Sequence, residues 1–129
     1  MCMMLYIGAD NELPIDSGDL IYLGNIHEAN TAIKKHFTKK FNYSVFTRAG
    51  WGCACGFNYD MGNELFEFIN KYVADDNCEL VSSWTGEEES EIECKEIINI
   101  NEFYRKKRFD IDVCRPDDFP LGKYIKVIK

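Results

Sequence analysis

The hydrophobic and polar positions of this chain follow two periods, and each period predicts a different secondary structure. Apolar residues at every second position predict a strand with one buried face, and short continuous apolar runs predict a buried strand. Strands of these two kinds are predicted at 3–8, 20–23, 41–47, 79–84, 92–100, 109–113 and 123–128. The β-strand is therefore the main element of the predicted fold.

The segment 25–37 carries apolar residues at the spacing of a helix. Ala29, Ile33 and Phe37 recur every four residues and define a predicted buried stripe. Asn25 is a residue type that often caps helices, because its side chain can accept a hydrogen bond from a free backbone N–H group. The pattern therefore predicts a helix that begins after Asn25.

A second helix is predicted from a cap at Asp60 or Asn63 as far as Ala74. Its apolar residues repeat at i, i+3, i+4, i+7 and i+8, which places them on one face. These residues are Leu65, Phe68, Ile69, Tyr72 and Val73. Glu67 and Lys71 lie four residues apart on the polar side, so we expect a favourable ion pair between them.

The predicted elements alternate as β-α-β-α-β in the middle of the chain. The two helices are long enough to connect parallel strands, which would join 20–23, 43–47 and 79–84 into a parallel core. The flanking strands have no such helices, so we expect them to pair antiparallel at the edges. The prediction is a single α+β domain over 1–129, with two main helices and a mixed sheet of five to seven strands.

Charge and composition narrow the classes of partner. The chain has 129 residues, a length typical of one domain, and a formal net charge of −7. It lacks the surplus of lysine and arginine that nucleic acids and anionic membranes attract, so neither is an expected partner. No apolar run reaches the ~20 residues that span a bilayer, and the apolar N-terminus lacks the basic residues of a signal peptide. We therefore expect a cytoplasmic protein.

The cysteines are the most distinctive chemical groups of the chain. We expect all of them to be free thiols, because the cytoplasm keeps thiols reduced. Cys53 and Cys55 lie in a glycine-rich segment, and in an extended backbone both sulfurs would face one side. They could bind a soft metal ion, act as redox or nucleophilic thiols, or simply be buried structural residues. The six cysteines are Cys2, Cys53, Cys55, Cys78, Cys94 and Cys114.

The predicted parallel core would place one candidate site at a single edge of the sheet. Ligands in open α/β sheets bind beyond the carboxyl ends of the strands. The candidate cleft residues therefore follow the three central strands, and they are Arg48, Trp51, Cys53, Cys55, Trp84 and His27. Arg48 could bind an anion or lower the pKa of a nearby thiol. The alternative is that the glycines and tryptophans only pack this edge.

Three segments together resemble one protein family. They are the opening 2–9, the motif Gly-Cys-Ala-Cys-Gly-Phe at 52–57, and the segment 80–87. Over most of its length the chain is similar to a family of small uncharacterised bacterial proteins with a Gly-Cys-x-Cys-Gly-Phe motif. That family has no established activity, so the resemblance implies a bacterial cytosolic single domain and transfers no catalytic residue.

A non-enzymatic binding or interaction module is the function that these features favour. The acidic balance, the aromatic content of 14% and the lack of a complete catalytic constellation in the sequence support it. The expected partner is a protein or a small molecule, and no cofactor is expected. The alternative is a thiol-dependent site on Cys53 and Cys55, either metal-binding or redox and nucleophilic, which leaves enzymatic activity open.

Overall fold

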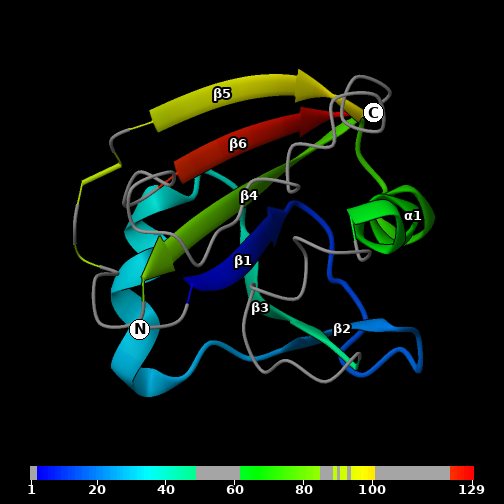
Figure 1. The fold of residues 1–129 in the computed structure, drawn as a ribbon, viewed down its shortest axis with the longest axis horizontal. Coiled ribbons are helices and arrows are strands. Elements are labelled where there is room, and N and C mark those ends of the chain that lie inside the picture. The colour runs from blue at the N-terminus through cyan, green and yellow to red at the C-terminus, as the bar shows by residue number, and fades with distance from the viewer. Residues whose placement is uncertain (1–2, 49–61, 85–88, 90, 93, 101–122) are drawn as a thin grey trace.

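Six strands and two helices make up the fold seen in a computed structural model, which describes residues 3–48, 62–84, 89, 91–92, 94–100 and 123–129. The six strands form one sheet, and the helices pack against it (Figure 1). The strands are β1 (Met3–Ala9), β2 (Ile21–Gly24), β3 (Phe41–Thr47), β4 (Asn77–Trp84), β5 (Cys94–Asn99) and β6 (Lys123–Ile128). The helices are the 3₁₀ helix η1 (Glu28–His36) and the α-helix α1 (Gly62–Tyr72).

The strand order in the sheet is β2-β3-β1-β4-β6-β5, which places β1 and β4 at the centre. The first five strands of this order pair antiparallel with their neighbours, whereas β5 pairs parallel with β6. The sheet is therefore mixed, and the domain has the α+β architecture that the sequence predicts.

One face of the sheet packs against α1. Leu5 and Ile7 of β1 lie in this layer and are almost fully buried. The predicted apolar face of α1 points into it, and Phe66, which lies beside that face, is buried as well. Five residues of this layer are at most 3% exposed, namely Leu65, Phe66, Phe68 and Ile69 of α1 and Val73 just after it. The side chain of Tyr72 is partly buried against them.

Side chains from distant segments satisfy the C-terminal end of α1. The backbone N–H of Ala74 donates to Oδ1 of Asn11 (3.0 Å), and Nδ2 of Asn11 donates to the carbonyl of Tyr72 (3.1 Å). The ammonium group of Lys129 donates to the carbonyl of Val73 (2.6 Å). The bonds to the two carbonyls supply partners that the last turn of a helix lacks, so they stabilise this end of α1.

The other face of the sheet packs against η1, and Figure 1 shows η1 in cyan and α1 in green on either side of the strands. Tyr6, Ile33 and Val81 form a fully buried cluster on this face. Phe37 lies over Gly8 of β1, where an added Cβ would come within 2.4 Å of the phenyl ring. The close approach of Phe37 therefore requires glycine at this position.

A buried carboxylate holds the end of η1 against the sheet. Glu79 of β4 is fully buried and accepts hydrogen bonds from the backbone N–H groups of Thr38 (2.9 Å) and Lys39 (2.8 Å). The hydroxyl of Thr38 (2.8 Å) and the hydroxyl of Tyr124 in β6 also donate to it. A charge is tolerated inside a protein where such donors replace its water. Glu79 therefore links the loop after η1 with β4 and β6.

The predicted parallel core is wrong. β2 and β3 pair antiparallel, and β1 lies between β3 and β4. The helices are long enough for parallel crossovers, but helix length does not determine which strand becomes the neighbour. β1 takes the central position because it is apolar on both faces, with Leu5 and Ile7 buried on one side and Tyr6 on the other.

The first helix is shorter and tighter than predicted. It begins at Glu28, and His27 rather than Asn25 is its N-cap. A 3₁₀ helix has three residues per turn, so residues four apart do not share a face. Ile33 is accordingly buried, whereas Ala29, four residues before it, is exposed.

The predicted strand at 109–113 lies outside the described residues. The other predicted strands correspond to the six strands of the sheet, with ends that differ by at most two residues. In the part of the chain that the structure describes, no helix combines the length and the apolar character that crossing a membrane requires.

Candidate functional site

Three of the predicted cleft residues, Trp51, Cys53 and Cys55, lie outside the described residues, and so does the side chain of Trp84. A thiol site on the two cysteines therefore stays a prediction. Arg48 follows β3 and His27 follows β2, and these strands run antiparallel. The two residues leave the sheet at opposite ends, so the expectation that one edge gathers both of them is wrong.

His27 has a local role at the start of η1. Its Nδ1 accepts a hydrogen bond from the backbone N–H of Ala29 (3.1 Å), and its side chain is otherwise exposed. This bond satisfies one of the free donors in the first turn of the helix. Capping therefore accounts for His27 without a ligand.

Arg48 holds the turn that precedes β2. Its Nε donates to the carbonyl of Asp19 (2.9 Å), and its backbone N–H donates to the carbonyl of Leu20 (2.8 Å). The guanidinium also forms an ion pair with Asp16 and lies 4.5 Å from the centre of the Tyr22 ring. Arg48 therefore positions Asp19 and Leu20 through the backbone.

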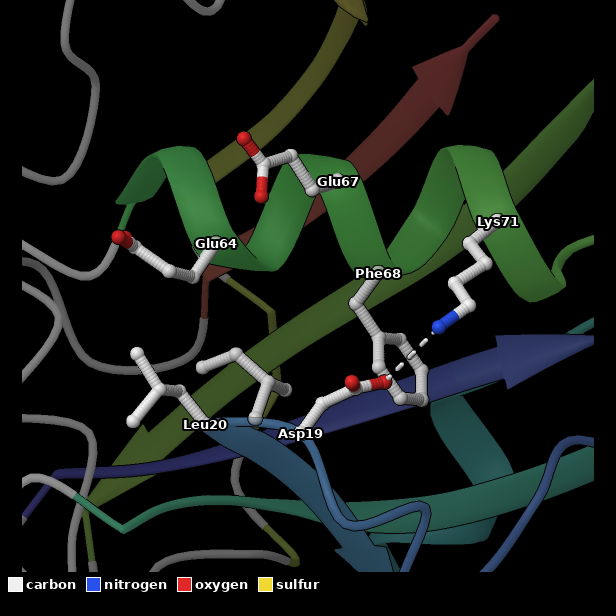
Figure 2. Close-up of a pocket in the computed structure, with 7 residues that line it drawn as sticks. Asp19, Leu20, Glu64, Glu67, Phe68 and Lys71 are labelled. Carbon is white, nitrogen blue, oxygen red and sulfur yellow. Dashed lines mark ion pairs between the residues drawn. The ribbon is translucent and has the colours of Figure 1, made fainter.

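Asp19 and Leu20 belong to a cleft between β2 and α1, which we call the acidic cleft. Its volume is about 260 Å³, and its lining carries three carboxylates and one ammonium group. The lining residues are Asp19, Leu20, Ile21, Glu64, Glu67, Phe68 and Lys71. Figure 2 shows Phe68 and Lys71 projecting from α1 toward Asp19, while Glu67 points away from β2. The cleft is therefore net negative and has an apolar floor.

Two side chains of α1 contact Asp19 across the cleft. The hydroxyl of Tyr72 donates to Oδ2 of Asp19 (2.9 Å), and Nζ of Lys71 lies 3.7 Å from the same atom. The Tyr72 hydrogen bond, with a further contribution from Lys71, holds the pKa of Asp19 below its usual value. Lys71 and Asp19 are both exposed, so their ion pair is weak and can open. Lys71 and Glu67 are both among the residues that the structure describes, and the ion pair predicted between them is not formed.

Glu64, in the first turn of α1, has an unsatisfied carboxylate oxygen. Its Oε2 is shielded from solvent and has no hydrogen-bond partner among the described residues. A buried polar group without a partner costs about 1–3 kcal/mol, and more if it is charged. The helix N-terminus favours negative charge and offsets part of this cost. The remaining deficit makes Glu64 the strongest candidate in the cleft for contact with a ligand.

The carboxylates of the cleft are not arranged as a metal site. Within the described residues, no group of three or more His, Cys, Asp or Glu side chains is placed to hold a metal ion. In Figure 2 the carboxylates of Asp19, Glu64 and Glu67 point in different directions. The cleft instead offers separate hydrogen-bond acceptors around apolar side chains.

Sequence reasoning missed Asp19 and Glu64 as site residues. Asp19 lies just before β2 and Glu64 lies in the first turn of α1, and both are ordinary places for a carboxylate. The signal that could have found them is the position of β2 beside α1, which depends on the strand order. Comparisons with family models, with curated proteins and with solved structures found no match to this chain.

Proposed function

We propose that this domain is a non-enzymatic binding module whose acidic cleft takes a small organic cation, namely an ammonium or guanidinium group on an aliphatic stem. The ligand would be a free amine or the end of a lysine or arginine side chain. The observation that carries the proposal is the buried and unpartnered Oε2 of Glu64 in a net-negative cleft. A cationic N–H donor would form a charge-assisted hydrogen bond with this oxygen.

The size and walls of the cleft support a slender ligand. Its volume of about 260 Å³ is small for a drug-sized ligand and suits one side chain. Leu20, Ile21 and Phe68 supply an apolar surface, and Leu20 is 51% exposed. An aliphatic stem would shield this surface from water, which contributes about 25 cal/mol for each Å² of apolar area.

The charges of the cleft favour a ligand that is itself charged. The three carboxylates of the lining attract a cation, and the exposed ion pair between Lys71 and Asp19 opens at little cost to admit one. The seven lining residues include no hydroxyl, thiol or imidazole group. This composition supports reversible binding rather than covalent chemistry.

The test is a titration of the labelled protein with butylammonium, butylguanidinium and 1-butanol, followed by NMR. We expect the two cations to produce saturable shifts in α1 and β2, and 1-butanol to produce weaker ones. Glu64→Gln should weaken cation binding about tenfold, because it replaces a charge-assisted hydrogen bond by a neutral one. The matched control is Glu28→Gln, which changes an exposed glutamate in the first turn of η1.

Two results would contradict the proposal. The first is that 1-butanol binds as tightly as butylammonium, which would mean that the cleft recognises only the apolar stem. The second is that Glu64→Gln and Glu28→Gln have the same effect, which would show that Glu64 does not contact the cation.

A further inference from the structure

A second cavity lies on the other face of the sheet, where the end of η1 meets β5 and β6. Its volume is about 360 Å³, and it shares no residue with the acidic cleft. It is lined by Lys35, His36, Phe37, Thr38, Ile92, Lys95 and Tyr124. We call it the basic cavity, because this lining contains two lysines and a histidine and no carboxylate.

The two lysines reach the basic cavity from different elements. Lys35 lies in the last turn of η1, where the helix end itself favours a cation. Lys95 lies in β5 opposite Tyr124 of β6, so both side chains leave the sheet on the same face. Lys95 lies in a strand, so the preference of a helix end for a cation does not explain its position. The Lys35 ammonium group donates to the backbone carbonyl of Glu89, which leaves its other N–H groups for a ligand. Two ammonium groups at one cavity in a chain of net charge −7 point to an anionic ligand.

The hydroxyl groups that line the basic cavity have a defined direction of hydrogen-bond donation. Those of Thr38 and Tyr124 both donate to the buried carboxylate of Glu79. A hydroxyl that donates on one side can only accept on its other sides, so both present lone pairs. Burial, together with the hydrogen bond to Glu79, also raises the pKa of Tyr124, which keeps the phenol protonated. The cavity therefore combines ammonium donors with hydroxyl acceptors.

We propose that the basic cavity binds a hydrogen phosphate group, as free phosphate or as a phosphate monoester. The charged oxygens would face Lys35 and Lys95, and the P–O–H group would donate to the hydroxyl oxygen of Tyr124. Phe37 and Ile92 would contact the organic part of a monoester. Sulfate has the same shape but no proton to donate, so its oxygens would oppose the lone pairs of the hydroxyls.

The test compares inorganic phosphate with sulfate at about pH 5, below the second pKa of a phosphate group (about 6), so that the group still holds a proton. The labelled protein is titrated with each anion at matched ionic strength, and the shifts are followed by NMR. We expect phosphate to bind several-fold more tightly, although sulfate carries the larger charge. Attraction by the lysines alone would give the opposite order. This comparison uses the unmodified protein and needs no variant to fold.

Variants then assign the contacts. Lys95→Gln should weaken phosphate binding about tenfold, because it removes a charge-assisted hydrogen bond. Lys34→Gln is the matched control, since Lys34 is an exposed lysine of η1 that does not line the cavity. Tyr124→Phe removes the acceptor, so the preference for phosphate over sulfate should disappear.

A third ligand, phenyl phosphate, distinguishes the two sources of the phosphate group. Tighter binding than inorganic phosphate would assign a monoester, and equal binding would assign free phosphate. The proposal is overturned if sulfate binds as tightly as phosphate, or if Lys95→Gln and Lys34→Gln weaken phosphate binding by the same factor. It is also overturned if the shifts do not saturate with a Kd below about 10 mM.

Discussion

Replacement of Glu79 by alanine is expected to destabilise the domain by about 2–6 kcal/mol. The Glu79 carboxylate accepts from the backbone N–H groups of Thr38 and Lys39 at 2.9 and 2.8 Å. Both groups lose their acceptor in the variant, and a donor that points to the buried position of Glu79 without a partner costs about 1–3 kcal/mol. A backbone N–H group cannot turn to another acceptor, so these two groups set the estimate. The hydroxyls of Thr38 and Tyr124 can rotate and add less.

Glu79→Gln separates the hydrogen bonds from the charge. The amide oxygen can accept from both backbone N–H groups, and the amide NH₂ would then face the two hydroxyls. A hydroxyl accepts as well as donates, so the network can form again with neutral hydrogen bonds. Loss of the charge weakens each bond, but it also removes the cost of burying a carboxylate. We therefore expect Glu79→Gln to lose less than about 2 kcal/mol.

The assay is urea unfolding at neutral pH, with the free energy of unfolding taken from the midpoint and the slope. Glu12→Ala, a change at an exposed glutamate, is the control and should stay within about 0.5 kcal/mol of the unmodified protein. If Glu79→Ala unfolds at the same midpoint as Glu12→Ala, Glu79 does not hold the loop after η1. If Glu79→Gln lowers the free energy of unfolding as much as Glu79→Ala, the charge of Glu79 and not its hydrogen bonds holds the loop after η1.

Two further predictions concern the core. Phe68→Ala should lower the free energy of unfolding by about 3–5 kcal/mol, because it empties a buried site beside the Tyr72 ring, whose centre is 4.7 Å from that of Phe68. Glu67→Ala is the control, and an equal urea midpoint for the two variants would show that the buried face of α1 is misassigned. Burial raises the pKa of the Cys78 thiol from 9.0 to about 12, so the folded state keeps a proton that the unfolded state releases. The contribution of Cys78 to the free energy of unfolding is therefore fully present below about pH 9 and is lost as the pH rises toward 12. In Cys78→Ala the free energy of unfolding should decrease less over this pH range. Mass spectrometry after iodoacetamide treatment at pH 8 should find Cys78 unmodified until urea is added, and rapid labelling in the folded protein would contradict its burial.

The sequence predicts a structural feature well when the residues that determine the feature lie close together in the chain. The apolar face of α1 and the ends of β3 and β6 could be predicted because their periods are set by residues close together in the chain. Phe66 shows the limit of this reasoning, because it lies beside the predicted face and is nevertheless buried. The 3₁₀ geometry of η1 was missed for a related reason, since a four-residue repeat assumes the period of an α-helix.

Features that depend on strand order could not be predicted. The burial of Glu79 requires donors from Thr38, Lys39 and Tyr124, which are about 40 or more residues away, and nothing in the local sequence marks Glu79 as an interior residue. Arg48 is a predicted site residue, but its partners are Asp16 and Asp19, which reach it only because β2 pairs with β3. Both errors arise because the sequence alone does not show which distant segments become neighbours in the fold.

The position of β6 has a consequence for how the chain is made. β6 follows both β4 and β5 in the sequence but lies between them in the sheet. During synthesis, at roughly 5–20 residues per second, the two earlier strands leave the ribosome before the strand that joins them. Until 123–128 emerge, β4 has an open edge and β5 has no partner strand among the described ones. A nascent chain at this stage would be open to pairing with other chains, so the arrival of β6 decides whether β4 and β5 are joined within one sheet or pair with strands of other chains.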